Sequence, residues 1–268
     1  ARGRPAAGDQ LMKVAGIQMD IAWEDPAANH EYVGRLDIGD ARLIVLPEMF
    51  ATGFTMDAER AAESAGETRE FLAGLAKEAG VYVLGGYAEP TAARPRNACS
   101  IYDPDGEEVL HYQKIHPFSL AREPEYYDAG DALETVTIDG VRVTPVICYD
   151  LRFPEIFRIA ADRTDLFVVI ANWPAKRSHP WRTLLMARAA ENQAYVLGVN
   201  RVGEAQGEPH QGDSMVVDPF GNVVDEAVGD RALIRGGVDA GEVRRAREHF
   251  SFLADRRPDV YRKLEGED

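Results

Sequence analysis

The sequence predicts an α/β protein in which mixed β-sheets carry helices on their outer faces. Short apolar stretches of strand length alternate along the chain with segments of helical spacing. Three pairs of strands are also separated by tight turns rich in Asp, Gly and Pro, which is the chemistry of β-hairpins. A purely parallel, doubly wound sheet contains no hairpins, so the pattern favours mixed sheets.

The domain organisation is expected to be simple. No linker rich in Pro, Gly or Ser divides the 268 residues. Residues 12–268 are therefore expected to form one domain, preceded by an N-terminal tail at residues 1–11. The hairpin turns at 103–106 and 218–221 resemble each other, but they share little more than turn chemistry.

The expected strands are apolar or alternating segments with turn residues at their ends. Single strands are expected at residues 13–19, 43–46, 81–87, 166–171, 195–200 and 233–238. Hairpin pairs are expected at 98–102 with 108–114, 135–138 with 141–148, and 214–217 with 222–225.

The expected helices are marked by their ends. Asp25 and Pro26 provide an N-cap and a first-turn proline for a helix reaching about Leu36. Gly80 in the C′ position ends a helix that starts near Glu67. Further helices are expected at 154–161, at 181–192 and from about 241, before a polar tail that starts at 252.

Composition excludes several classes of function. Asp and Glu number 45 against 30 Lys and Arg, a formal net charge of −15, whereas surfaces that bind nucleic acid are basic. No apolar run is long enough to span a membrane, and the first ten residues lack the apolar core of a secretory signal. Two cysteines do not make a disulfide framework. A cytoplasmic protein without nucleic-acid or membrane partners is expected.

Three apolar strands end in residues that can do chemistry. Glu48 follows the strand at 43–46, Cys148 follows 143–147, and Asn172 with Trp173 follows 168–171. Ligands in α/β folds bind at the carboxyl ends of strands. These side chains are therefore expected to converge on one cleft.

Cys148 lies where a buried strand meets a helix, a turn that can expose a nucleophile and direct backbone N–H groups at an oxyanion. A buried, inert thiol is the alternative, and it is the expectation for Cys99. A thiol nucleophile requires a base. Glu48, partly desolvated after its strand, is a better candidate than any of the six histidines, of which His116 is the best placed. A surface acid or N-cap is the alternative for Glu48.

Lys114 is one of five lysines in a chain whose other basic residues are Arg. This bias is consistent with genomic base composition or with salt adaptation. At the end of a hairpin strand, the compact ammonium of Lys114 could hold an oxyanion, or it could protect a sheet edge.

The contexts of these residues resemble the Glu-Lys-Cys triad of the nitrilase superfamily of carbon–nitrogen hydrolases. The matches are LPEMFATGF around Glu48, YQKIHPF around Lys114 and CYDLRFPEIFR from Cys148, supported by VAGIQMDIAWED, ARAAENQAYVLGVNRVG and GDSMVVDPFGNVV. The segment IANWPAKRSHPWRTLLMARAAENQ is similar to the aliphatic amidase and ω-amidase branch. The resemblance implies a four-layer α-β-β-α sandwich, a homodimer or larger homo-oligomer, and no cofactor.

The resemblance also implies roles for individual residues. Glu48 would be the general base, Cys148 the nucleophile that forms a thioester, and Lys114 with the backbone N–H of Tyr149 the oxyanion donors. A second glutamate would position Lys114. Glu123 and Glu125 both qualify, and Glu123 aligns better.

Residues around the triad are assigned from their positions in the chain. Phe54, Trp173 and Arg177 are expected to line the substrate pocket, and Arg177 or Lys176 to pair with a substrate carboxylate, unless they are solvated loop residues. Asp150 and Arg152 are expected to form an internal ion pair or a hydrogen-bonded brace. No His or Cys spacing indicates a metal site.

The sequence therefore predicts a cysteine-dependent amidase acting on a small linear amide, for which the ω-amide of a 2-oxo dicarboxylic acid is a candidate. An N-carbamoyl-amino-acid hydrolase or a nitrilase would use the same triad. A non-catalytic binding or assembly module is the alternative from another class.

Overall fold

The computed structural model of the protein describes residues 11–266, so the tail expected at residues 1–11 lies outside the described residues except for Leu11. Two β-sheets form the centre of this part of the chain. In the first sheet, six strands follow the order β13-β1-β2-β3-β4-β5. These strands are β1 (Met12–Gln18), β2 (Leu43–Val45), β3 (Tyr82–Glu89), β4 (Arg96–Tyr102), β5 (Glu108–Gln113) and β13 (Ala232–Val238).

The second sheet of the described chain follows the order β10-β11-β9-β8-β7-β6, and β12 pairs with β11 beside this path. Its strands are β6 (Val136–Ile138), β7 (Val141–Ile147), β8 (Leu166–Ala171), β9 (Tyr195–Asn200), β10 (Val202–Ala205), β11 (Glu208–Val217) and β12 (Val223–Val228). Each sheet has parallel strands in its middle (β1-β2-β3 and β7-β8-β9) and antiparallel partners outside them.

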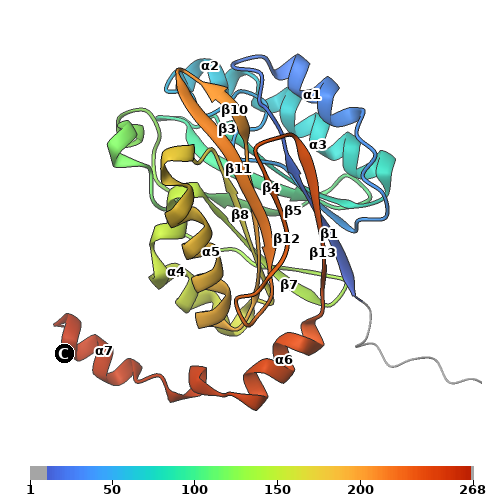
Figure 1. Ribbon diagram of the computed structural model, residues 1–268. Helices are drawn as coiled ribbons and strands as arrows, with labels where there is room; N and C mark the ends of the chain where they lie inside the picture. Colours follow the sequence, from blue (N-terminus) through green and yellow to red (C-terminus); the bar gives the residue numbers. More distant parts are fainter. Residues whose placement is uncertain (1–10, 267–268) are drawn as a thin grey trace, which may run out of the picture.

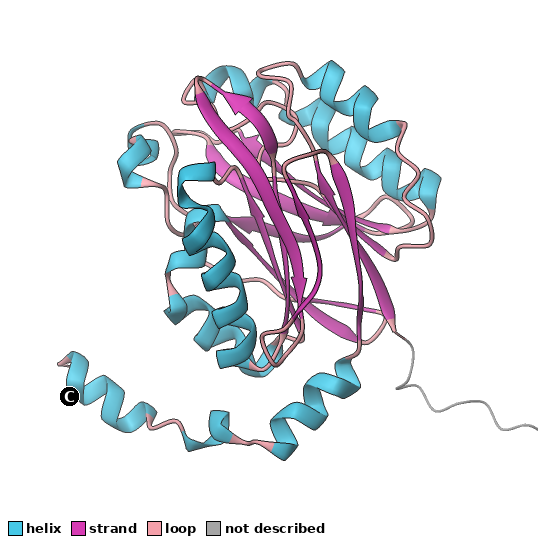
Figure 2. Cartoon of the chain, viewed as in Figure 1, coloured by secondary structure: helices cyan, strands magenta, loops and turns pink. Residues whose placement is uncertain are grey.

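Helices cover the outer face of each sheet (Figure 1). α1 (Pro26–Gly34) and α3 (Ala65–Ala79) lie on the first sheet, and α4 (Pro154–Ala160) and α5 (Ser178–Asn192) lie on the second. Figure 2 shows the two magenta sheets between these helices. The expected mixed-sheet α/β protein with outer helices, arranged as a four-layer α-β-β-α sandwich, is confirmed.

The apolar pattern of the chain explains the layers. The strand β8 (LFVVIA) is buried at every position because parallel neighbours flank it and layers cover both of its faces. On the other side of the molecule, α3 buries Leu72 and Ala76 against the first sheet and ends at Gly80, whose left-handed backbone (φ 67°) closes the helix as expected. Burying a leucine such as Leu72 contributes about 2 kcal/mol.

The last part of the chain differs from the expected polar tail. After α6 (Ala240–His249), the chain forms a 3-10 turn at Phe252–Asp255 and then α7 (Pro258–Glu265), which extend as an arm beside the body (Figure 1). Pro258 in the first turn starts α7, a signal that the polar composition concealed. The short helix α2 (Ala58–Glu63) and the strand β10 were also not expected. No helix between residues 11 and 266 combines the length and apolarity needed to cross a bilayer.

The sheets bring three strand ends to one side of the molecule. β2 leads into Glu48, β7 into Cys148 and β8 into Asn172. Gly86 of β3 permits this approach, because a Cβ there would lie 2.8 Å from the backbone N of Met49 and 3.0 Å from Cα of Glu48. The loop that carries Glu48 therefore packs directly on the neighbouring strand.

Candidate active site

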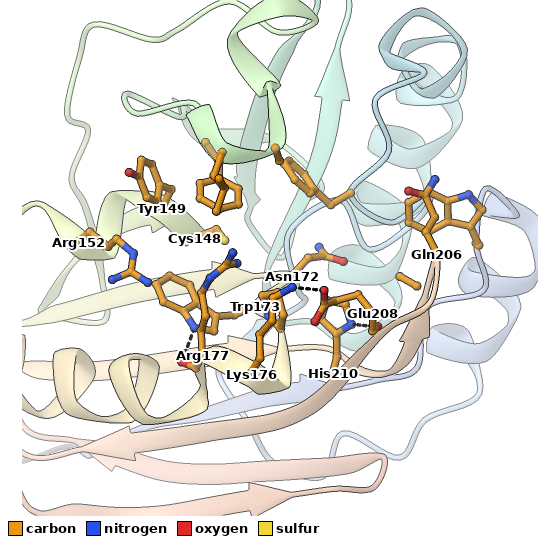
Figure 3. Close-up of a pocket in the computed structure, with 17 residues that line it drawn as sticks. Cys148, Tyr149, Arg152, Asn172, Trp173, Lys176, Arg177, Gln206, Glu208 and His210 are labelled. Carbon is orange, nitrogen blue, oxygen red and sulfur yellow. Dashed lines mark hydrogen bonds and ion pairs between the residues drawn. The ribbon is translucent and has the colours of Figure 1, made fainter.

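A pocket of about 370 Å³ opens at these strand ends (Figure 3). Cys148 lies in its wall, half-buried. The residues expected to line the substrate pocket, Phe54, Trp173 and Arg177, all line it, and so does Tyr149, whose backbone N–H is the expected oxyanion donor. The structure thus places these four side chains around one thiol.

The backbone at Cys148 has an unusual conformation. The strand β7 ends at Ile147, and a 3-10 turn then runs through Cys148–Arg152. Cys148 has φ +48°, in the left-handed region that side chains other than glycine rarely adopt. Such backbone outliers concentrate at functional sites. This strand-to-turn junction presents the Cys148 side chain at the pocket instead of continuing the buried strand.

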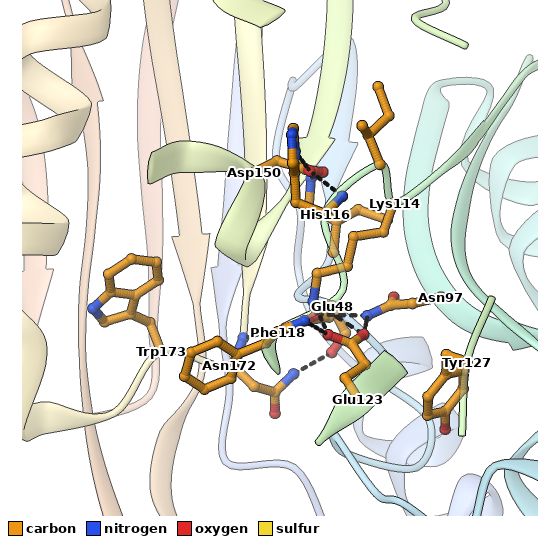
Figure 4. Close-up of polar contacts among 12 residues, drawn as sticks. Glu48, Asn97, Lys114, His116, Phe118, Glu123, Tyr127, Asp150, Asn172 and Trp173 are labelled. Carbon is orange, nitrogen blue, oxygen red and sulfur yellow. Dashed lines mark hydrogen bonds and ion pairs between the residues drawn. The ribbon is translucent and has the colours of Figure 1, made fainter. Parts of the chain in front are cut away.

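Glu48 and Lys114 meet inside the protein (Figure 4). Both charges act on the thiol of Cys148. Nζ of Lys114 lies 2.9 Å from Oε1 of Glu48, and both side chains are almost completely buried. Lys114 directly follows β5 and Glu48 follows β2, so the two reach each other across the first sheet. The Lys114 ammonium also lies 5.0 Å from the ring centre of Phe54, which gives the cation an aromatic wall.

Of the two candidate second glutamates, the structure brings Glu123 to this group. Its Oε2 lies 2.9 Å from Nζ of Lys114, its carboxylate accepts a hydrogen bond from the backbone N–H of Phe118, and it is fully buried. Glu125 is exposed and pairs with Arg122. The better alignment of Glu123 agrees with this placement.

The group has more negative than positive charge, because one ammonium serves two carboxylates. Burial and the nearby Glu48 raise the pKa of Glu123, although Lys114 opposes them. Burial alone would lower the pKa of Lys114, but Glu123 and Glu48 outweigh it and raise this pKa above its usual value. Lys114 therefore stays charged, and the excess negative charge favours keeping a proton within the group.

The thiol of Cys148 shares this environment. Burial raises its pKa well above the usual value, and Glu48 raises it further, while Lys114 acts in the opposite direction. The resting thiol is therefore protonated at neutral pH. A base beside it would have to take its proton for the sulfur to react, and Glu48 is the carboxylate whose charge acts most strongly on this thiol.

Two asparagines hold the carboxylates in place. Nδ2 of Asn97 donates to Oε1 of Glu48 at 2.7 Å and to Oε1 of Glu123 at 2.9 Å. The backbone N–H of Asn172 donates to Oε2 of Glu48 at 2.8 Å, and its Nδ2 donates to the Glu48 carbonyl at 2.6 Å. The sequence marks Asn172 as a strand-end residue but assigns it no role. Asn97 lies inside a hairpin strand, and no sequence signal marks it.

The cations of the pocket differ in their partners. Lys176 forms an ion pair with Glu208. The guanidinium of Arg177 lies over the ring of Phe118 at 5.2 Å, and that of Arg152 lies over Trp173 at 4.8 Å (Figure 3). No carboxylate in residues 11–266 forms an ion pair with Arg152 or Arg177. These two guanidinium groups are thus available for a ligand, whereas Lys176 is occupied.

The expected ion pair between Asp150 and Arg152 is wrong. The alternative expectation, a hydrogen-bonded brace, holds for Asp150. Its carboxylate accepts hydrogen bonds from Tyr112, His116 and the backbone N–H of Ile147. Arg152 instead lines the pocket. Asp150 finds one donor in the backbone N–H of Ile147, in its own turn, and the others in the segment around Lys114, so its carboxylate is not turned to Arg152.

Cys99 and His116 lie outside the group formed by Glu48, Lys114 and Glu123. Cys99 is fully buried in the core, and burial raises the pKa of its thiol far above the usual value. His116 bonds to Asp150 and not to Glu48, Lys114 or Glu123. Within the described residues, no group of three His, Cys, Asp or Glu side chains is arranged to hold a metal ion.

Comparison with known proteins gives consistent results. The sequence model of the carbon–nitrogen hydrolases matches residues 13–248. The omega-amidase YafV of Escherichia coli (strain K12) is 37% identical, covering 91% of this chain and 96% of its own. The 2-oxoglutaramate amidase of Bacillus subtilis (strain 168) is 31% identical, covering 92% and 98%.

Solved structures share the fold. A CN-hydrolase superfamily protein from Xanthomonas campestris superposes with a TM-score of 0.87 at 32% identity, over 92% of this chain and 98% of its own. A mutant of the amidase from Nesterenkonia sp. AN1, in complex with butyramide, gives 0.83 at 25% identity, over 97% and 98%. Since the family model spans most of the chain and these relatives match it nearly end to end, the chain belongs to the carbon–nitrogen hydrolase family of enzymes.

Proposed function

We propose that the protein is a cysteine-dependent amidase that converts a small linear amide to a carboxylic acid and ammonia through a thioester. One observation carries the proposal: a buried ammonium between two carboxylates lies beside a half-buried thiol at the wall of a pocket. This arrangement combines a base, a nucleophile and an oxyanion donor in one place.

In the first half-reaction, Glu48 takes the proton of Cys148 as the sulfur attacks the amide carbon. The carbonyl oxygen becomes an oxyanion that Lys114 and the backbone N–H of Tyr149 stabilise. Glu48 then returns the proton to the amide nitrogen, the C–N bond breaks, and ammonia leaves. A donor in the position of Lys114 contributes about 3 kcal/mol to such a transition state.

In the second half-reaction, water attacks the thioester carbon. Glu48 takes a proton from this water, and the same donors hold the second oxyanion. The C–S bond then breaks, the sulfur regains a proton from Glu48, and the carboxylic acid is released. Glu123 keeps Lys114 in position, and Asn97 and Asn172 keep the Glu48 carboxylate in position throughout.

The substrate is proposed to be an amide with an acidic group, such as the ω-amide of a 2-oxo dicarboxylic acid. The small pocket and the free guanidinium groups of Arg152 and Arg177 support an acyl chain that ends in a carboxylate. The names of the relatives from Escherichia coli and Bacillus subtilis support the same class.

Ammonia release from a panel of compounds tests the proposal. Wild type and Cys148→Ala are assayed with 2-oxoglutaramate, succinamate, propionamide, N-carbamoyl amino acids and short nitriles. The proposal expects wild type to turn over the acidic amides fastest and Cys148→Ala to be inactive on all of them. Turnover of nitriles or carbamoyl compounds without turnover of amides would contradict the reaction, and a preference for propionamide would contradict the substrate.

The homodimer expected from the family resemblance remains a prediction. Apolar side chains are exposed on α4 (Ile159, 67%) and on the C-terminal arm (Leu264, 80%), and burying them in a second copy would be favourable. Sedimentation equilibrium measures the assembly directly, and a monomer at micromolar concentration would contradict this prediction.

A further inference from the structure

The carboxylate of Asp150 connects two segments of the site without lining the pocket. It is fully buried. Oδ2 accepts hydrogen bonds from the Tyr112 hydroxyl at 2.7 Å and from the backbone N–H of Ile147 at 3.0 Å. Oδ1 accepts from the backbone N–H of His116 at 3.0 Å and from Nδ1 of the same histidine at 2.8 Å. Since a carboxylate oxygen accepts, Nδ1 of His116 is the donor in this contact.

The positions of these donors in the sequence are informative. Tyr112 and His116 lie two residues before and two residues after Lys114. Ile147 and Asp150 lie one residue before and two residues after Cys148. The buried carboxylate of Asp150 therefore links the segment that carries Lys114 to the segment that carries Cys148, with contacts on both sides of each residue.

Ring packing reinforces the same connection. The imidazole of His116 stacks on Phe153 with ring centres 3.7 Å apart and planes 8° apart. Phe153 directly follows the turn at Cys148–Arg152, and its backbone N–H donates to the Asp150 carbonyl at 3.0 Å. His116 thus contacts both the carboxylate and the far end of the turn, and it fixes the turn against the segment of Lys114.

We propose that Asp150, together with His116, is a positioning residue that sets the placement of the Lys114 ammonium relative to the Cys148 thiol. The inference rests on the proposed function, because it assigns the two groups a shared reaction. Asp150 acts through its hydrogen bonds and does not touch the substrate. Displacement of a catalytic group by about 1 Å can cost about a hundredfold in rate, so a small loosening of this connection should be visible in kcat.

Asp150→Asn tests the inference, and Asp165→Asn is its matched control. Asp165 is also a buried aspartate, and it accepts hydrogen bonds from Arg142 through the backbone N–H at 2.9 Å, Nε at 2.9 Å and Nη2 at 2.6 Å. It lies at the opposite end of β7 from Cys148. Both substitutions keep shape and remove one charge, but only Asp150→Asn replaces an acceptor with a donor next to N–H groups of the site.

The expected result is a split between kcat and KM. Asp150→Asn should lower kcat for the best amide at least thirtyfold and leave KM within threefold, whereas Asp165→Asn should leave kcat within twofold. Equal kcat in the two variants would overturn the inference, as would an effect of Asp150→Asn on KM alone.

His116 provides a second test in case Asp150→Asn does not fold. His116→Ala removes the hydrogen bond to Oδ1, and His116→Asn places an amide N–H near the former Nδ1. His116→Ala should lower kcat about tenfold, and His116→Asn should recover most of the loss. Recovery that is no better than with Ala would overturn the role of His116.

Alkylation of Cys148 by iodoacetamide separates this inference from the proposed function. Lys114 lowers the pKa of the thiol, so a misplaced ammonium should slow alkylation at a fixed pH. Asp150→Asn should react at least fivefold more slowly than Asp165→Asn. Equal alkylation rates would overturn the inference, and an absence of ammonia release by wild type would overturn only the proposed function.

Discussion

Nζ of Lys114 lies 2.9 Å from Oε1 of Glu48, and both side chains are almost completely buried. The same ammonium serves Glu123, so neither carboxylate has a cation of its own. A buried charge group of this kind is costly to form, because each charge loses its water of hydration. In this chain it lies against the one half-buried cysteine of the described residues.

Replacement of Lys114 should abolish most of the activity. Lys114→Met removes the proposed oxyanion donor and should lower kcat about a hundredfold or more, which corresponds to about 3 kcal/mol. Lys114→Arg should recover little of this activity, because a planar guanidinium group does not fit a position that holds a compact ammonium between two carboxylates. Steady-state ammonia release measures both. Lys77→Ala, on the exposed face of α3, is the control, and a similar loss there would contradict the assignment.

Replacement of Asn97 should reveal the excess negative charge through pH. Asn97→Asp would place a third carboxylate beside Glu48 and Glu123, and their proximity would raise its folded-state pKa. A raised folded-state pKa gives stability that is present at low pH and lost as pH rises. The free energy of unfolding of this variant should therefore fall about 2 to 4 kcal/mol further below wild type at pH 8 than at pH 5.

Asn97→Ala is the control for this charge effect. It removes the same hydrogen bonds without adding a charge. It should lower the free energy of unfolding by about 1 to 3 kcal/mol, and by a similar amount at both pH values. Urea titrations at the two pH values measure the free energy of unfolding of both variants and of wild type. A pH-independent difference between Asn97→Asp and wild type would show that the two carboxylates carry less charge than inferred.

His210 should make the protein less stable in acid. Burial, followed by the charge of Arg201, lowers its pKa from 6.5 to about 4. A lowered folded-state pKa gives stability that is present above about pH 6.5 and lost as pH falls through 4, because the unfolded chain takes up the proton first. Between pH 7 and pH 4.5 this residue alone should cost about 2 to 3 kcal/mol.

His210→Asn isolates that contribution. Its amide can donate to the Glu208 carbonyl in place of Nδ1, which lies 3.0 Å from that oxygen. Between pH 7 and pH 4.5, the free energy of unfolding of His210→Asn should fall by about 2 to 3 kcal/mol less than that of wild type. Parallel pH profiles for the two proteins would contradict the assignment.

Arg152 and Arg177 should determine the preference for acidic amides. Substitution of either by alanine removes a guanidinium that has no ion-pair partner in residues 11–266 and faces the pocket. kcat/KM for 2-oxoglutaramate should fall about tenfold or more, mainly through KM, while that for propionamide should change less than threefold. Lys176→Ala is the control, because Lys176 already pairs with Glu208. Equal effects on both substrates would remove the two arginines from substrate binding.

The sequence predicted those parts of the molecule that local chemistry determines. The apolar run of β8, the glycine that ends α3 and the Asp-Gly turn between β6 and β7 each carry a short-range signal. Strand ends also indicated where Glu48 and Cys148 would lie. The expectation that these ends converge follows from the topology of parallel strands, and the structure brings them together.

Other features depend on contacts between distant segments, which no local pattern records. Asn97 lies 49 residues from Glu48 and becomes its hydrogen-bond donor only when the first sheet is in place. An ion pair with Arg152, two residues along the chain, was one of the two expectations for Asp150, but the tertiary fold supplies Tyr112 and His116 as its partners. The left-handed backbone at Cys148 likewise has no marker in the sequence, since glycine is absent there.

The central claim is that Cys148 carries the acyl group. Rapid mixing of enzyme with excess 2-oxoglutaramate or succinamate, followed by acid quenching and mass spectrometry of the Cys148 peptide, tests it directly. The account predicts that the acyl group appears on Cys148 together with a burst of ammonia close to one per enzyme, and that Cys148→Ala shows neither. Ammonia release by Cys148→Ala at the wild-type rate would contradict it.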